Sequence, residues 1–509
     1  MKRGLLILAV AIVAITGPAV VGADEHLVPA TFATLEAALV NAAVAPGDTI
    51  TVTSGNYDQI YQDFDTRDDG LLIRSVPAYA CTLSNATSNI LLVEDDGTWE
   101  SSDLVWEGIV FSGTGNAGGV ELASTNSWTF NNCIWTGDWD YPISVGAGSN
   151  KDQTDSLTFN NCQFNITNQN WGVKPGILFN APGTNLTFNN TSFDYSGAGT
   201  ITSGSQPMLD IMGMSGADFI NCTFTSPNEM DTAGVMSYIM ARDAGAPTGP
   251  AGDIDFFNCT FTGPSIMDGV INSALILLKF EDGVDSCDVI GSTFTSAAGS
   301  AQNVNGVKWE NGDGSGGDPN ATSGSAISNT FNGLRISVGF LEHSVGLVAS
   351  GNRINGQGGT DSDGIYFQDA QDCTATNNWV SNCRAGFRST NGDRSPTFEN
   401  ARNRVVGNFI QGNTYAYFAD TGDFDAWLVG GNILHGNTNV GSIDFGVTPI
   451  TSLATWQTQT VPDLAAEAPG HYMSLGDVLF SDYPGALRGA GSVPRGWGKL
   501  LGSRNGLTN

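Results

Sequence analysis

Arginine and aspartate side chains gather in one part of this 509-residue sequence, and that part offers the most chemistry. The chain holds only 20 Lys and Arg against 51 Asp and Glu. Between residues 353 and 404, however, arginines and aspartates are interleaved: Arg353, Asp361, Asp363, Asp369, Asp372, Arg384, Arg388, Asp393, Arg394, Arg402 and Arg404. Carboxylates are the ligands that a hard cation needs, and an arginine acts as a base only in an unusual site. The alternative is that these charges are solvated positions without a ligand.

Four of these residues are spaced so that a repeating fold would bring them together. Asp361 and Asp363 precede Arg384 and Arg388 by 21 to 27 residues, which is close to one period of the repeat described below. We therefore expect the four side chains to meet on one face. Tyr366, Arg353 and Arg394 lie near them in the sequence and are candidate substrate-binding residues.

Aromatic residues supply a second candidate surface, because aromatic rings stack on the faces of sugars. Trp139 and Tyr141 lie in the segment GDWDYP, which has the composition of a loop, and we expect them at the surface. Trp135 occupies a position that the repeat assigns to the interior, so we expect it in the core.

A six-residue motif recurs along the chain and predicts what positions these residues. It reads FNNCIW at Phe130–Trp135, FNNCQF at Phe159–Phe164 and FNNTSF at Phe188–Phe193, and looser copies follow. The fourth residues of the copies recur every 23 to 37 residues: Ile109, Cys133, Cys162, Thr191, Cys222, Cys259, Ser292, Asn329, Asn352, Asn378, Asn408 and Asn432. A recurrence of this length indicates a solenoid, a propeller or an array.

The local pattern decides between these architectures. On each side of the Asn pair the apolar residues alternate with period two, as in a strand with one buried face, and Asn tolerates the left-handed backbone of a tight bend. Four-stranded propeller blades would need about 40 residues each and hairpin turns, so the variable spacing favours a parallel β-helix. We expect roughly 12 to 13 turns, with equivalent residues stacked about 4.8 Å apart.

The cysteines of the repeat are expected to be buried and unpaired, and a disulfide at Cys373 or Cys383 stays open. Four of them, Cys133, Cys162, Cys222 and Cys259, share one motif position and should stack as small apolar side chains. A disulfide framework is the alternative reading of an even count in an exported protein. No CxxC occurs, so a cysteine metal site is not expected.

The two ends of the sequence predict export and capping. A basic start, an apolar run and a small-residue site predict a signal peptide at residues 1–23. A cap and first strand are expected at 24–57, the parallel β-helix at 58–450 and a C-terminal cap and tail at 451–509. The formal net charge of −31 argues against nucleic acid or anionic lipid as a partner, and no later segment is apolar enough to enter a membrane.

The sequence resembles the pectin-lyase-like superfamily of right-handed parallel β-helix proteins. The segment TFATLEAALVNAAVAPGDTITVTSGNY at Thr31–Tyr57 is similar to the capping helix and first strand with which members begin, and the segment starting at Ser452 is similar to the closing segment of exported bacterial members. The resemblance covers nearly the whole chain after residue 23. The Gly-Asp-Asp and Gly-His-Gly motifs of the polygalacturonases in this superfamily are absent.

This resemblance implies a secreted, cell-surface or periplasmic protein that binds or processes an extracellular polysaccharide. Lyases of the superfamily hold Ca²⁺ on acidic side chains against a uronate carboxylate, and a basic side chain removes a proton from the sugar. By that analogy Asp361 and Asp363 are expected to bind Ca²⁺, and Arg384 and Arg388 join them as catalytic residues. The alternative function is a non-catalytic structural or adhesion protein of the cell surface or matrix.

Overall fold

The computed structural model describes most of the chain between residues 23 and 452. Its description leaves gaps at 58–59, 62–68, 86–89, 94–102, 115–117, 123–126, 140, 146–155, 168–176, 180–184, 196–206, 215, 227–228, 231–234, 243–251, 265, 268–273, 282–283, 285, 297–302, 311–323, 360, 391–399, 401, 420–427, 443–445 and 453–454. Beyond these, it describes residues 455, 473–474 and 478–479. The predicted signal peptide, apart from residue 23, and most of the predicted C-terminal cap lie outside the described residues.

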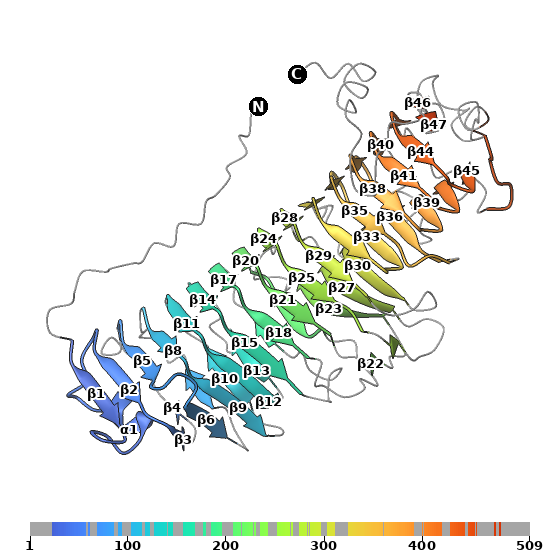
Figure 1. Ribbon diagram of the computed structural model, residues 1–509. Helices are drawn as coiled ribbons and strands as arrows, with labels where there is room; N and C mark the ends of the chain where they lie inside the picture. Colours follow the sequence, from blue (N-terminus) through green and yellow to red (C-terminus); the bar gives the residue numbers. More distant parts are fainter. Residues whose placement is uncertain are drawn as a thin grey trace.

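Three long parallel sheets run side by side along one axis (Figure 1). Between residues 49 and 442, each coil of the chain contributes one strand to sheet A, then one to sheet B, then one to sheet C. Within the described residues, sheet A has 16 strands: β1 (Glu25–Val28), β2 (Thr49–Val52), β5 (Leu72–Ser75), β8 (Val105–Glu107), β11 (Trp128–Asn131), β14 (Ser156–Asn160), β17 (Asn185–Asn189), β20 (Gly216–Ile220), β24 (Ile254–Phe257), β28 (Cys287–Ile290), β31 (Gly324–Ile327), β34 (Val348–Ser350), β37 (Thr374–Thr376), β40 (Arg404–Val406), β43 (Leu428–Gly430) and β46 (Met473–Ser474).

Sheets B and C follow the same order along the axis. In the part of the chain that the structure describes, sheet B has 15 strands: β3 (Gly55–Tyr57), β6 (Cys81–Asn85), β9 (Val110–Thr114), β12 (Ile134–Asp138), β15 (Gln163–Ile166), β18 (Ser192–Asp194), β21 (Thr223–Thr225), β25 (Thr260–Thr262), β29 (Thr293–Thr295), β32 (Thr330–Asn332), β35 (Arg353–Asn355), β38 (Trp379–Ser381), β41 (Phe409–Gln411), β44 (Ile433–His435) and β47 (Val478–Leu479). Sheet C has 14 described strands: β4 (Ile60–Tyr61), β7 (Leu91–Val93), β10 (Gly118–Leu122), β13 (Tyr141–Val145), β16 (Ile177–Phe179), β19 (Leu209–Met212), β23 (Val235–Arg242), β27 (Ala274–Glu281), β30 (Val304–Glu310), β33 (Ile336–Leu341), β36 (Asp363–Gln368), β39 (Ala385–Thr390), β42 (Tyr415–Ala419) and β45 (Asn439–Ser442). A short pair, β22 (Glu229–Met230) and β26 (Ile266–Met267), lies outside these sheets.

The expected right-handed parallel β-helix is confirmed, and it has more turns than the sequence motif predicted. The count of roughly 12 to 13 turns is slightly too low, because 14 coils contribute a strand to all three sheets within the described residues. The motif count began at Ile109 and therefore missed the first coils, whose strands β1, β2 and β5 lack the Asn pair but pair in register all the same. The helix α1 (Leu35–Leu39) lies at the same end and buries Leu35, Ala38 and Leu39.

The repeated hexads stack in register, as the sequence predicts. Phe159 pairs with Phe130 on one side and with Phe188 on the other, and the ring centroids lie 5.0 Å and 4.6 Å apart with nearly parallel planes. The first Asn of each pair forms an external ladder, in which Asn160 Nδ2 donates to Asn131 Oδ1 over 2.9 Å. The second Asn makes the bend, with a left-handed φ of 52° at Asn161.

The fourth motif position forms a buried column whose chemistry changes along the axis. All eight cysteines are buried and free, which confirms the expectation for those of the repeat. Cys162 Sγ donates to the carbonyl oxygen of Phe130 over 3.3 Å. From Asn329 onward the column consists of asparagines, and each Nδ2 donates to the Oδ1 of the next asparagine over 2.9 to 3.1 Å: Asn329, Asn352, Asn378, Asn408 and Asn432. These amide bonds fix the register of neighbouring coils at the bend between sheets A and B.

Sheet C departs from strict alternation, and the departure decides which residues reach its outer face. An added Cβ at Gly364 would lie 2.4 Å from the buried Val380 side chain, so Gly364 faces the interior, as its neighbour Ile365 does. Two consecutive inward positions amount to a bulge-like break in the pattern. Asp363 and Tyr366, three residues apart, consequently share the outer face of sheet C.

Candidate functional site

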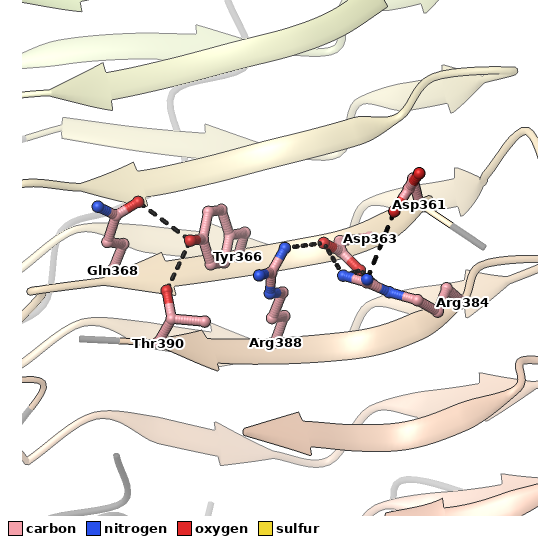
Figure 2. A network of polar contacts seen from close by, with 7 residues as sticks. All are labelled: Asp361, Asp363, Tyr366, Gln368, Arg384, Arg388 and Thr390. Carbon is pink, nitrogen blue, oxygen red and sulfur yellow. Dashed lines mark hydrogen bonds and ion pairs between the residues drawn. The ribbon is translucent and has the colours of Figure 1, made fainter. Parts of the chain in front are cut away.

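The four charged residues expected to meet do meet, on the outer face of sheet C. Asp363 begins β36, Arg384 precedes β39 and Arg388 lies within β39, one coil further on. Arg384 donates from Nε and Nη2 to Asp363 Oδ1 over 3.2 and 2.9 Å, and its Nη2 also lies 2.9 Å from Oδ2 (Figure 2). Arg388 Nη1 donates to the same Oδ2 over 3.0 Å. The Asp363 side chain is only 1% exposed, so both of its oxygens are held by guanidinium groups away from solvent.

Aromatic rings complete this network. The Arg388 guanidinium carbon lies 4.7 Å from the centroid of the Tyr366 ring, and that of Arg384 lies 4.9 Å from the Phe418 ring. Tyr366 Oη contacts Gln368 Oε1 at 3.0 Å and Thr390 Oγ1 at 2.6 Å (Figure 2). Arginine stacked on an aromatic face and paired with a carboxylate has its charge neutralised and its planar group fixed.

This arrangement does not favour the expected Ca²⁺ site at Asp361 and Asp363. Asp363 already accepts hydrogen bonds on both oxygens from two arginines, and a cation there would be repelled by them. Asp361 has a 63% exposed side chain and lies 3.6 Å from Arg384. Among the described residues no group of three or more His, Cys, Asp or Glu is placed to hold a metal ion. The catalytic roles expected for Asp361, Asp363, Arg384 and Arg388 stay predictions.

The expected substrate-binding residues are distributed over different parts of the coil. Tyr366 belongs to the network on sheet C, whereas Arg353 begins β35 in sheet B. Trp139 was expected on a loop surface, and that prediction is wrong: its ring is buried above Gly113, where an added Cβ would lie 2.4 Å from the ring. Tyr141 begins β13, and Arg394 lies outside the described residues.

Arg353 lies in a groove on the outer face of sheet B. The groove has a volume of about 520 Å³ and crosses four successive coils, from β32 to β41. It is lined by one cation, one indole ring, amides and hydroxyls: Thr330, Asn332, Arg353, Asn355, Trp379, Ser381 and Gln411. We call this surface the sheet B groove.

Two stacked columns of outward side chains build the sheet B groove. In the first column Thr330, Arg353, Trp379 and Phe409 are register partners on successive strands. The Arg353 guanidinium carbon lies 5.6 Å from the centroid of the Trp379 ring, and Phe409 meets Trp379 edge to face at 4.9 Å. In the second column the residues are Asn332, Asn355, Ser381 and Gln411. An aromatic ring beside amides, a hydroxyl and a cation suits a ligand that has both apolar faces and many hydroxyl groups.

The sequence held a signal for this groove that charge clustering did not detect. Each residue of the first column directly follows a residue of the asparagine column, as Arg353 follows Asn352 and Trp379 follows Asn378. Aligning the later coils on those asparagines would have placed Arg353 and Trp379 one above the other. The search for clustered charges instead grouped Arg353 with Asp363 and Arg388, which lie on sheet C.

Comparison with known proteins found one family model that matches part of the chain and several solved structures that match it. The model of the NosD family, described as a periplasmic copper-binding protein, matches residues 288–442, which is less than a third of the chain. Among solved structures, the chain is similar to a mannuronic acid specific polysaccharide family 6 lyase enzyme from human gut microbiota. The identity is 12%, the TM-score is 0.27, and the similarity covers 83% of this chain and 82% of the other. The search of curated proteins found no match.

The segment that the NosD model matches contains both the sheet B groove and the network around Asp363.

No helix in the described part of the chain is long and apolar enough to cross a membrane, and α1 has only five residues.

Proposed function

We propose that this protein binds an extracellular polysaccharide in the sheet B groove. The observation that carries the proposal is the lining of the groove, in which the Trp379 ring lies beside Arg353, Asn355 and Gln411. A sugar presents apolar C–H faces to a ring and hydroxyls to amides, and a uronate would present its carboxylate to Arg353. The groove crosses several coils, so it suits a chain of sugars better than a single one.

The geometry favours binding over cleavage. A lyase needs a base that is free to take a proton, and an arginine that forms two or more charge-assisted hydrogen bonds holds its proton firmly. Arg384 and Arg388 both donate to Asp363, on a different sheet from the groove. A polysaccharide lyase-like activity on acidic glycans is therefore the second candidate function, and the same experiment tests it.

Copper binding, suggested by the description of the NosD family, is not supported by the residues that the structure describes. Thiolates are the side chains expected to hold copper most strongly. Burial raises the pKa of the Cys373 and Cys383 thiols to about 12, and each Sγ donates to a backbone carbonyl. As noted above, the described residues contain no cluster of His, Cys, Asp and Glu that fits a metal ion. We therefore derive no function from copper.

The test is a binding panel with a matched pair of variants. The purified protein is titrated calorimetrically with neutral and uronate-containing polysaccharides, with and without Ca²⁺, and unsaturated uronate absorbance is followed in parallel. Trp379→Ala should weaken binding by about tenfold, which corresponds to the loss of about 1.4 kcal/mol. Arg353→Ala should weaken binding of uronate polymers more than that of neutral ones.

The control is Arg402→Ala, which removes an exposed arginine paired with Asp372 away from the groove. It should leave binding unchanged. Equal binding by Trp379→Ala and the wild type, or no binding across the panel, would contradict the proposal. Uronate absorbance that appears with time would instead establish lyase activity.

A further inference from the structure

A second set of cations lies on the outer face of sheet C, beginning two coils before the network around Asp363. In β30, Gly306 and Val307 both face the interior, because an added Cβ at Gly306 would contact Leu334 and Phe331 and because Val307 belongs to the main core. Asn305 and Lys308 therefore face outward. Ile336, the register partner of Asn305 on β33, likewise lies outside the main core.

The polar atoms of the Asn305 side chain have no hydrogen-bond partner among the described residues. Its side chain is fully buried, and among the described residues neither its Nδ2 nor its Oδ1 has a hydrogen-bond partner. Arg335 Nε, on the neighbouring coil, is also buried without a partner in the described part of the chain. The backbone N–H of Arg335 donates to Val304 over 2.8 Å, which places Arg335 beside Asn305. Buried polar groups of this kind usually have a partner, because leaving one unsatisfied destabilises the folded protein.

Lys308 differs from its register partner Lys279 in having no counter-ion. Lys279 donates to Glu281 and lies 3.4 Å from Glu310, whereas Lys308 forms no ion pair with any described residue. Burial lowers the pKa of Lys308 to about 8; Glu310 opposes this shift, and the positive charges of Lys279 and Arg335 add to it. The negative charge of Glu342 also raises the pKa of Lys308 and so opposes the effect of burial.

We propose that this face binds an oxyanion group, a carboxylate, sulfate or phosphate, between Lys308, Arg335 and the Asn305 amide. The anion would supply the counter-ion that Lys308 lacks and acceptors for Asn305 Nδ2 and Arg335 Nε. Asn305 Oδ1 then accepts a hydroxyl from the molecule that carries the anion. This site lies on a different sheet from the sheet B groove and does not depend on the function proposed for that groove.

The experiment measures the reactivity of individual lysines. The sequence contains six lysines, so peptide mapping after reaction with an amine-acylating reagent resolves each of them. At pH 8 Lys308 should react readily, because much of it is unprotonated there. Inorganic sulfate, inorganic phosphate and galacturonate are added in separate arms, and at a concentration ten times its Kd a bound anion should slow the labelling of Lys308 by about tenfold.

Lys279 is the control within the same peptide map. Burial lowers its pKa, but Glu310 and Glu281 outweigh burial and hold the pKa above its usual value, so Lys279 should stay unlabelled in every arm. Protection by galacturonate alone identifies a carboxylate on a sugar, and protection by sulfate or phosphate identifies a tetrahedral oxyanion. Labelling of Lys308 that none of the three anions slows would overturn the proposal.

The variant Asn305→Leu distinguishes two roles for Asn305: a ligand-binding amide, or a buried polar group that only destabilises the fold. If the amide binds the ligand, the variant loses most of the protection of Lys308 by the anion. If Asn305 is only an unsatisfied polar group, Asn305→Leu raises the melting temperature and leaves that protection unchanged, which would refute the proposed role.

Discussion

At the scale of single residues, burial decides what each charged side chain can do. The Asp363 side chain is 1% exposed and accepts hydrogen bonds from two arginines, whereas the side chain of Asp361, two residues earlier, is 63% exposed. The sequence alone ranks the two carboxylates equally. Their difference comes from their places in the coil: Asp361 lies in the bend before β36, whereas Asp363 begins the strand, where Arg384 and Arg388 of the next coil cover it.

Removing the Asp363 charge should destabilise the fold strongly. Asp363→Asn leaves two partly buried guanidinium groups without their counter-ion, so we expect a loss of about 3 kcal/mol in the free energy of unfolding. The matched control is Asp361→Asn, which should cost less than about 0.5 kcal/mol because its ion pair is exposed. Urea unfolding of both variants measures the difference. Similar small losses in the two variants would show that the network contributes little.

A column of aspartates on the outer face of sheet A predicts a pH dependence of stability. Burial raises the pKa of Asp255 to about 7 from the usual 3.8, and Asp288, Asp218 and Asp253 add to this shift through their charges. Between pH 3.8 and about 7, Asp255 is protonated in the folded state and ionised in the unfolded state. This contribution therefore stabilises the protein at low pH and is lost as the pH rises toward about 7.

Asp255→Asn removes this dependence while keeping an oxygen that can accept the hydrogen bond from Asp288 N–H. We expect the variant to melt at a higher temperature than the wild type at pH 8, and the gap to close toward pH 4. Thermal melts followed by circular dichroism across this pH range measure the gap. A difference between the two proteins that stays constant with pH would contradict the assignment.

At the scale of strands, the hexad made the architecture predictable from the sequence. Phe130, Phe159 and Phe188 recur at one spacing, so their stacking follows from parallel pairing alone. The burial of Trp139 was not predictable, because the space it fills is created by Gly113 one coil away. The sheet B groove was missed for a related reason: its members are outward residues whose adjacency depends on the alignment of coils of unequal length.

The asparagine column should contribute most to stability where its bonds are most numerous. Asn378 accepts from the N–H and the Nδ2 of Asn352 and donates to Ala349 and Asn408, all within 3.0 Å. Asn378→Ala leaves several of these buried groups unsatisfied, so we expect a loss of about 3 kcal/mol, measured by urea unfolding.

Asn378→Thr provides a control that the chain itself suggests. Thr191 occupies the same position in an earlier coil and donates to Phe159 O from its hydroxyl. A threonine at 378 restores one donor and one acceptor and should lose less stability than alanine. A loss as large as that of alanine would mean that the column requires the full amide.

At the scale of the whole molecule, each coil contacts mainly the coils directly before and after it. In such a solenoid, stability is close to a sum of coil and interface contributions. Residues 162–190 form one complete period, and their deletion would join Asn161 to Thr191, a junction of the same type as Asn190–Thr191. We expect the shortened protein to fold, with its long axis reduced by about 5 Å.

X-ray scattering measures that length, and circular dichroism measures the strand content. Deleting residues 162–175, which removes β15 and leaves β16 in place, should instead disrupt folding because the coils no longer close. Aggregation of both proteins, or of the full-period deletion alone, would contradict the modular description.

The interchangeable junctions between coils have a consequence for how such a chain can change over generations. Unequal recombination between the gene segments that encode two similar hexads would insert or delete one whole coil. The reading frame and the sequence of every other coil would stay the same. A binding surface built from outward columns would then become longer or shorter in unit steps, without any single substitution. The length of the sheet B groove, and with it the length of the proposed polysaccharide contact, would then be inherited as a number of coils.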